Sequence, residues 1–203
     1  MNRDEFFQTL LTRNSSNFRG FDQSLESRLG AQGTVLVCDS SGFTRITRAR
    51  GILHFLSLLA QSYQLSHPIV ARHGGVLIKS EADNLIARFD DPVAAVRCAM
   101  AIQRAHQERN SSLPEDEHFH LAIGLDYGSY LLLEDDAFGD AVNIAYKVGE
   151  DLASADEILV TDRWVNQVGQ ATLASDGIRW EKAGDHDAGQ VPVSLFRVLW
   201  GRS

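Results

Sequence analysis

An apolar run that ends on an acidic residue restricts what this chain can fold into more than any other feature. Residues 34–44 read TVLVCDSSGFT, in which an apolar stretch predicts a buried strand, Asp39 closes it, and small residues lead into a helical pattern at Phe43. The free N–H groups of a helix N-terminus bind anions, and a divalent cation would link a nearby carboxylate to a phosphate. Taken alone, the segment leaves a second interpretation open, in which Asp39 only caps the helix.

Composition narrows the class of protein. The 203 residues are 44% hydrophobic and 23% charged, which predicts a globular domain with a core. The formal net charge of −8 argues against nucleic acid as a partner, since that contact needs a basic face. Cys38 and Cys98 stand outside disulfide and metal-ligand spacings, which favours a reducing compartment. With no apolar signal core at the start and no apolar run long enough for a bilayer, we expect a cytoplasmic protein that contacts no membrane.

The chain divides into a short N-terminal segment and a larger unit. Residues 3–13 carry apolar side chains at helical spacing, and residues 14–33 read as a polar connector with a short helix around 23–29. We expect the first helix to pack on its own domain or on a second copy, because its polar face is not rich in lysine. The boundaries we predict are 1–32 for the helical segment and connector, and 33–203 for the main domain.

The main domain alternates strands and helices. After the first strand we expect helices over 43–50 and 52–72, a hairpin over 76–89, a helix from 92 to about 109, a strand over 119–126, a turn at Gly128 and a strand over 130–133. A helix over 140–153, a strand over 158–161, a short helix over 162–167 and strands over 178–182 and 193–199 complete the pattern. This order predicts an α+β fold with a ferredoxin-like split βαβ core, in which a mixed sheet carries helices on one face.

Polar residues recur at the ends of these elements. Asp83 stands at the turn of the predicted hairpin, and two acids at adjacent strand ends bind one or two divalent cations. Lys79 lies on the same hairpin, where a solvated turn lysine is the alternative. Asn143 and Lys147 are one helical turn apart on one face, an arrangement that an ordinary exposed stripe also produces.

Together these segments resemble the catalytic domain of the class III nucleotidyl cyclases, the adenylate/guanylate cyclase family. The similarity covers about 33–198, and its motifs keep the family's order and spacing. It implies that 33–203 is a cyclase-like catalytic domain. The segments that carry it are VCDSSGFT at 37–44, GGVLIKSEADNLIARF at 74–89, the helix over 92–107, LAIGLDYG at 121–128, FGDAVNIAYKV at 138–148, EILVTD at 157–162 and PVSLFRV at 192–198.

The resemblance implies a role for each matched residue. Asp39 and Asp83 would hold two Mg²⁺ or Mn²⁺ ions per site on a nucleoside triphosphate, and Ser40 completes the implied metal site. Lys79 and Asp136 fall on the base-reading pair, where a lysine donor and an aspartate acceptor suit adenine. The other matched positions are Asn143 for the ribose, Lys147 for the transition state, and Ser41, Gly42, Phe43 and Thr44 for the phosphates.

The family's reaction and assembly follow from the same resemblance. Its members convert ATP to 3′,5′-cyclic AMP and pyrophosphate by attack of the 3′-hydroxyl on the α-phosphorus. Their sites lie at a head-to-tail dimer interface, with the metal aspartates on one protomer and the base-reading residues on the other. The implied partners of this chain are therefore ATP and a second copy of itself, in a homodimer with two equivalent sites.

Several positions depart from the family pattern. Lys147 replaces an arginine, so the charge is kept and the planar fork is lost. Ala82 replaces a glycine beside Asp83, which costs about 1 kcal/mol if the turn needs a positive φ. Glu81 adds a carboxylate that we expect to be solvated, and Asp135 is the neighbouring alternative to Asp136.

Three functional interpretations remain. The retained aspartate pair favours an adenylate cyclase. Ala82 and Lys147 motivate a non-catalytic nucleotide-binding or dimerisation module on a cyclase fold. A cyclase for another base, with GTP or a pyrimidine nucleotide as substrate, is the third, because two residues alone define the predicted base pocket.

Overall fold

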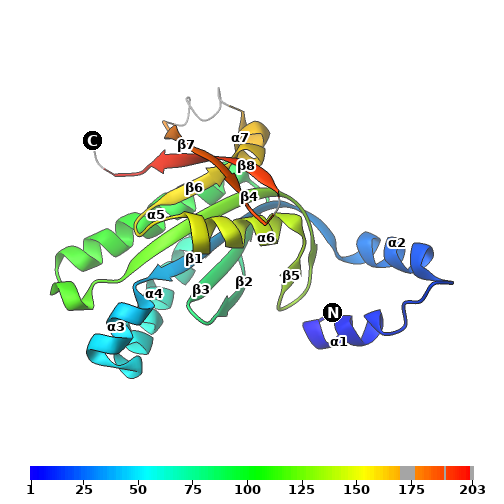
Figure 1. Cartoon of the computed structure of the whole chain (residues 1–203), viewed down its shortest axis with the longest axis horizontal. Coiled ribbons are helices and arrows are strands. Elements are labelled where there is room, and N and C mark those ends of the chain that lie inside the picture. The colour runs from blue at the N-terminus through cyan, green and yellow to red at the C-terminus, as the bar shows by residue number, and fades with distance from the viewer. Residues whose placement is uncertain (170–176, 190, 202–203) are drawn as a thin grey trace.

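The computed structural model describes residues 1–169, 177–189 and 191–201. Its centre is an eight-stranded mixed sheet in the order β2-β3-β1-β4-β6-β8-β7, with β5 paired to β4 (Figure 1). The predicted α+β class is confirmed. The strands are β1 (Gly30–Ser41), β2 (Val76–Glu81), β3 (Asn84–Phe89), β4 (His120–Leu132), β5 (Ala137–Phe138), β6 (Ile158–Thr161), β7 (Arg179–Asp187) and β8 (Pro192–Leu199); the α-helices are α1 (Arg3–Leu10), α2 (Phe18–Leu29), α3 (Phe43–Arg50), α4 (Ile52–Arg72), α5 (Pro92–Ser111), α6 (Asp140–Lys147) and α7 (Asp162–Val168).

The split βαβ core surrounds β1. This strand pairs antiparallel with β3 on one side and with β4 on the other. Helices α3 and α4 connect β1 to β2, and β3 lies between those two strands; α5 connects β3 to β4, and β1 lies between them. This is the ferredoxin-like arrangement that the sequence predicts. The parallel pairing of β4 with β6 makes the sheet mixed and extends it toward β8 and β7.

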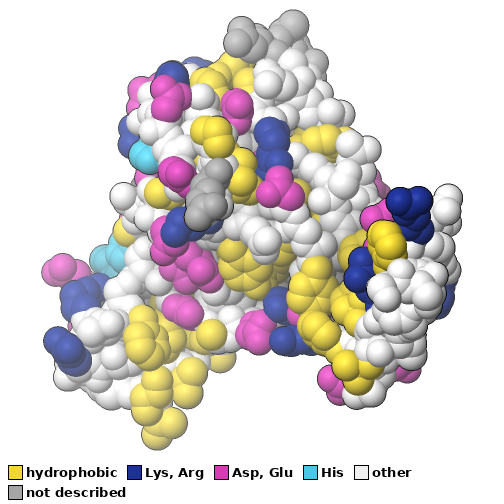
Figure 2. All heavy atoms as spheres, turned by 45° about the vertical axis from the view of Figure 1, so that its right-hand side comes forward, with side chains coloured by type: hydrophobic (Ala, Val, Ile, Leu, Met, Phe, Trp, Pro, Cys, Tyr) yellow, Lys and Arg dark blue, Asp and Glu magenta, His cyan; other side chains and the backbone are white. Residues whose placement is uncertain are grey.

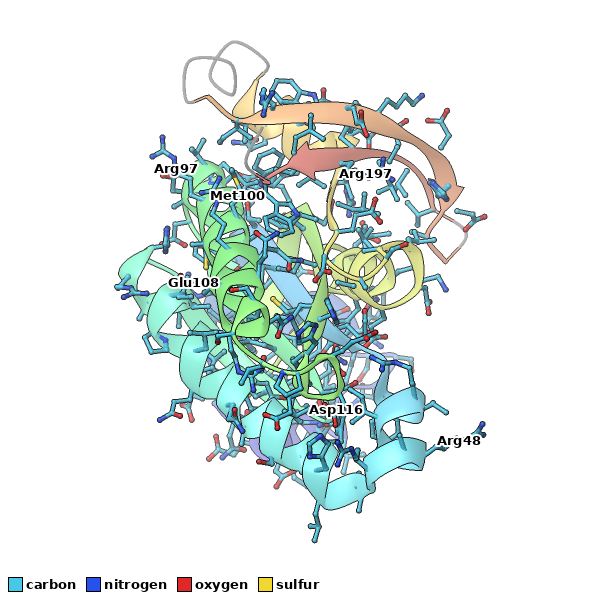
Figure 3. All side chains as sticks on the ribbon, turned by 90° about the vertical axis from the view of Figure 1, so that its left-hand side faces the viewer. Arg48, Arg97, Met100, Glu108, Asp116 and Arg197 are labelled. Atoms are coloured by element: carbon cyan, nitrogen blue, oxygen red, sulfur yellow. The ribbon has the colours of Figure 1, made fainter. Side chains whose placement is uncertain are left out.

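Helices cover both faces of the sheet, so the prediction of helices on one face is wrong. Leu36 and Cys38 of β1 belong to the large core under α4 and α5, whereas Val35 and Val37 belong to a second cluster under α6. Figure 3 shows α5, marked by Arg97, Met100 and Glu108, on one side of the sheet and α6 on the other. The continuous apolar run at 35–38 is the pattern of a strand buried on both faces.

Two local predictions also need correction. Gly128 does not form a turn: it lies inside the continuous strand β4 and pairs with Gly33 of β1, and the return strand is the short β5. The helix predicted over 140–153 ends at Lys147 and continues as a π-helical turn, Val148–Leu152. Glycine favours a turn in the sequence, but here Gly128 leaves room for α6 above the strand, because a Cβ on it would lie 3.2 Å from the Cβ of Ala141.

The N-terminal helices pack beside the sheet on β4 and β5. Phe6, Leu25 and Leu133 form a small buried cluster, and Phe6 stacks on Phe138 with ring centroids 5.8 Å apart. Helix α2 begins at Phe18, earlier than the predicted short helix, and leads directly into β1 at Gly30. In the part of the chain that the structure describes, no helix combines the length and apolar character needed to cross a membrane.

Candidate active site

The predicted metal residues meet at one end of β1. Asp39 lies near the C-terminal end of β1, on the face that carries Val35 and Val37. Asp83 lies in the two-residue turn between β2 and β3. Ser40 Oγ donates a hydrogen bond of 2.6 Å to Asp83 Oδ2, which ties the hairpin turn to β1. The structure therefore brings Asp39, Ser40 and Asp83 together, as the sequence predicts.

This end of the sheet has an excess of negative charge. Burial, together with the charges of Asp83 and Glu150, raises the pKa of Asp39 to about 7. The described residues contain no group of three or more acidic, histidine or cysteine side chains arranged to hold an ion by themselves. Mg²⁺ is commonly held by one or two carboxylates plus substrate phosphates. The carboxylates of Asp39 and Asp83, which repel each other, therefore fit a metal ion that arrives with a nucleotide.

The hairpin turn beside the carboxylates is strained and pinned. Ala82 has φ = 52°, in the left-handed region that disfavours residues with a Cβ. This is the positive φ considered in the sequence analysis, where Ala82 replaces a glycine of the family pattern. Tyr63 Oη of α4 donates to the carbonyls of Ala82 and Asn84, each at 3.1 Å. Asp83 keeps its hydrogen bond to Ser40 in spite of the strain.

The predicted base-reading residues also come together. Lys79 Nζ of β2 lies 2.9 Å from Asp136 Oδ1, which precedes β5. Asp136 is buried while Asp135 is exposed, so the structure distinguishes the two candidates. Glu81 lies 2.6 Å from Lys79, so this carboxylate is paired rather than merely solvated. Burial opposes the charge of Lys79, but the hydrogen bonds to Glu81 and Asp136 outweigh it and raise the pKa of the ammonium group.

Helix α6 carries the remaining predicted residues. Asn143 is exposed, and Lys147 Nζ pairs with Asp151 Oδ2 at 2.5 Å across one turn. Burial raises the pKa of Tyr146, and the positive charge of Lys79 opposes this. The helix therefore connects the two clusters, since Glu150 and Asp151 in the turn that follows act on Asp39.

The predicted phosphate-binding segment is only in part a turn. Ser41 is the last residue of β1 and pairs with His120, whereas Gly42 has φ = 99° and precedes the first turn of α3. Phe43 and Thr44 lie in that turn, where backbone N–H groups have no helical acceptor. The ring of Phe43 packs edge-on against Phe55 of α4 at 4.7 Å, which orients the helix start.

Sequence reasoning missed a buried ion network that holds α6 on the sheet. Asp126 of β4 has no exposed surface and accepts hydrogen bonds from Thr161 Oγ1 at 2.5 Å and from the guanidinium of Arg163. Arg163 also donates to Asp140, at the start of α6. An aspartate within an otherwise apolar strand was the available signal, because a buried charge needs a partner.

The fold and the two side-chain clusters define a domain of the nucleotidyl cyclase type, and comparison with known proteins gives the family. No model of a protein family matches the sequence. The chain is 33% identical over 141 residues to the Rhizobium meliloti (strain 1021) protein named "Putative adenylate cyclase 3", covering 69% of this chain and 23% of that protein. The chain thus spans about a quarter of that relative's length.

Solved structures extend the comparison. The structure titled adenylate/guanylate cyclase/hydrolase from Silicibacter pomeroyi has a TM-score of 0.72 and 28% identity, covering 83% of this chain and 96% of that one. The adenylyl cyclase CyaB from P. aeruginosa matches in fold with a TM-score of 0.71 and 20% identity, covering 85% and 97% of the two chains. The chain belongs to the class III adenylate/guanylate cyclase catalytic-domain family.

Proposed function

We propose that this domain is an adenylate cyclase, which converts ATP to 3′,5′-cyclic AMP and pyrophosphate at the interface of a homodimer. The observation that carries the proposal is the contact between Lys79 and Asp136. It brings a hydrogen-bond donor and a hydrogen-bond acceptor from distant parts of the chain side by side. A neighbouring donor and acceptor complement the N1 acceptor and the exocyclic amine of adenine. The name of the Rhizobium relative agrees with this choice of base.

Each cluster has a defined task in the proposed reaction. Asp39 and Asp83 would hold the divalent metal ions, which would supply charge neutralisation and alignment of the attacking and leaving oxygens. Gly42 and the start of α3 offer backbone N–H groups to the phosphates. Asn143 orients the ribose, and the ammonium of Lys147 stabilises the negative charge that develops on the oxygens of the transferred phosphoryl group.

A second copy of the chain completes the site in this proposal. Exposed apolar side chains gather at the end of the molecule formed by α3 and α4, where Leu53 is 80% exposed (Figure 2). Exposed Phe7 and Leu11 of the N-terminal segment form a second apolar surface. Apolar surface of this kind is typical of contacts between chains. A head-to-tail pair would then contain two identical composite sites.

Product formation tests the activity. We would incubate the purified protein with ATP, GTP, CTP or UTP in Mg²⁺ or Mn²⁺ and separate the cyclic nucleotides by chromatography. We expect cyclic AMP from ATP, abolished by Asp83→Ala and retained by Asp90→Ala, a matched change at an aspartate whose side chain is 85% exposed. Cyclic GMP in place of cyclic AMP would refute the choice of base.

Mixing two inactive variants tests the composite site. Asp83→Ala removes a metal ligand and Lys79→Ala removes a base-reading residue, so a mixed dimer has one intact site. If the sites are shared, random reassortment restores roughly a quarter of the wild-type activity, because half of the dimers are mixed and each has one site of two. No recovery from a mixture that reassorts would contradict a site built from two copies.

One alternative has a specific observation in its favour. Ala82 is strained next to Asp83, and Lys147 is engaged by Asp151, so a non-catalytic nucleotide-binding module fits these two features. That function predicts nucleotide binding in calorimetry with no cyclic product from any of the four nucleotides.

A further inference from the structure

The N-terminal residues contact the loop that carries Asp136. The N–H of Arg3 donates to Asp135 Oδ1 at 2.8 Å, and the N–H of Glu134 donates to the carbonyl of Met1 at 3.1 Å. The stack of Phe6 on Phe138 holds the same two segments together on the other side of the loop. Figure 1 shows α1 lying next to the β4–β5 hairpin. The start of α1 is thus part of the surroundings of the base-reading residues.

The side chain of Arg3 faces one particular oxygen of Asp136. Its Nε lies 3.6 Å from Asp136 Oδ2, beyond hydrogen-bond length. The other oxygen, Oδ1, is engaged by Lys79 Nζ at 2.9 Å and by the N–H of Ala137 at 2.8 Å. Asp136 Oδ2 is therefore the oxygen with capacity for a donor from a ligand, and Arg3, whose side chain is half exposed, stands beside it.

The three side chains form a sequence of donor, acceptor and donor. Lys79 and Arg3 offer only donors, and ionised Asp136 between them offers only acceptors. Adenine presents the complementary order around its N6 amine, with the N1 acceptor on the Watson–Crick side of the amine and the N7 acceptor on the Hoogsteen side. Guanine presents O6 in place of the amine, so an acceptor would face the carboxylate of Asp136. An unpaired acceptor opposite a carboxylate discriminates against the wrong base.

We propose that Arg3 is a third base-reading residue, which donates to N7 of adenine while Lys79 and Asp136 read N1 and the amine. This inference rests on the proposed function, because it assumes that Lys79 and Asp136 read the base. It gives the N-terminal helix a task in substrate selection, in addition to its packing on β5. The pair of Arg3 with Asp136 is loose enough for the guanidinium to turn toward a base, since no hydrogen bond joins them.

Replacing one atom of the substrate tests the contact between Arg3 and N7. In 7-deaza-ATP a C–H group replaces N7, and the other hydrogen-bonding atoms of adenine stay in place. We expect the wild-type protein to use 7-deaza-ATP with kcat/KM lower than that for ATP by roughly tenfold, because a hydrogen bond from a charged donor is lost. In Arg3→Gln the difference between the two substrates should shrink to about twofold or less, and Arg3→Lys should retain an intermediate difference.

A matched variant separates base reading from packing. Arg13→Gln removes another arginine of the N-terminal segment, which pairs with Asp22 rather than with the site, and should keep the full preference for ATP. Thermal unfolding of each variant verifies that the fold is intact. Equal use of both substrates by the wild-type protein, or an unchanged preference in Arg3→Gln, would overturn the proposal.

Binding measurements keep this inference distinct from the proposed activity. If no nucleotide yields a cyclic product, the dissociation constants of ATP and 7-deaza-ATP with Mg²⁺, measured by calorimetry, replace kcat/KM in the same comparison. A preference for ATP that disappears in Arg3→Gln would support the base contact although the cyclase activity had failed. Equal dissociation constants in the wild-type protein would refute it.

Discussion

The sharpest test of the packing beneath the site is a single methyl group at Gly124. A Cβ built on this residue of β4 would lie 2.4 Å from the backbone nitrogen of Gly149 and 2.7 Å from the carbonyl oxygen of Ala145. Both contacts are with backbone, so no side-chain rotation relieves them. Gly124→Ala must therefore push the end of α6 and the π-helical turn away from the sheet.

The expected cost follows from the geometry. Forcing extra atoms into a packed interior costs about 1–3 kcal/mol, and we place this change at about 2–3 kcal/mol because the displaced atoms belong to the main chain. For a chain of this size 1 kcal/mol corresponds to roughly 2–4 °C, so the Tm should fall by roughly 5–10 °C. Because α6 carries Asn143 and Lys147, cyclic nucleotide formation should fall as well.

Gly128 supplies the control on the same strand. Its Cβ would meet only the Cβ of Ala141, at 3.2 Å, a contact between side-chain atoms that a small shift relieves. Both substitutions change the propensity of the same strand in the same way, so their difference isolates the close approach at Gly124. Differential scanning calorimetry of the two variants gives the comparison. We expect the Tm of Gly124→Ala to lie roughly 5 °C or more below that of Gly128→Ala. A difference in Tm of less than about 1 °C would refute the steric reasoning.

Three further predictions concern single residues. Lys147→Arg should raise kcat by roughly threefold to tenfold, because a guanidinium makes two hydrogen bonds to a phosphate, and an unchanged or lower kcat would contradict this. Ala82→Gly should raise the Tm by roughly 1–3 °C, since relief of the left-handed strain exceeds the entropy that glycine adds to the unfolded chain, and a lower Tm would count against it. Burial, with a smaller contribution from Arg109, lowers the pKa of His106 to about 4, so the folded state resists protonation and stability should decline as pH falls from about 6.5 to about 4. Urea titrations at pH 7.5 and pH 5 should differ by about 2 kcal/mol on this account, and a pH dependence that survives in His106→Gln would assign the loss to other groups.

Sequence patterns predicted the central fold because its strands are strongly apolar and end at recognisable residues. The run at 35–38 marked β1, and the order of the motifs led to the split βαβ core and to the meeting of Asp39 with Asp83. The prediction that helices cover one face of the sheet was wrong, since α6 covers the face opposite α4 and α5. A strand that is apolar at every position indicates burial on both faces, so the signal was present.

Other features had no local signal. Gly128 is extended because Gly33 faces it across the ladder, and pairing between distant residues is not visible in a single segment. The π-helical turn after Lys147 follows from the close approach of Gly149 to the sheet, which is a property of packing. The approach of Arg3 to Asp136 joins the two parts into which the sequence was divided, so that division gave no reason to expect it.

The two aspartates that we propose as metal ligands lie in regions of the sheet that differ in protection against amide exchange. Asp39 belongs to β1, which is hydrogen-bonded on both sides, whereas Asp83 closes the hairpin whose outer strand, β2, lies at the edge of the sheet. Edge hairpins open locally at lower free energy than central strands, so their amide hydrogens exchange earlier. A ligand that bridges both aspartates would have to hold the hairpin closed, and its binding energy would slow exchange in β2 while leaving the already slow β1 unchanged.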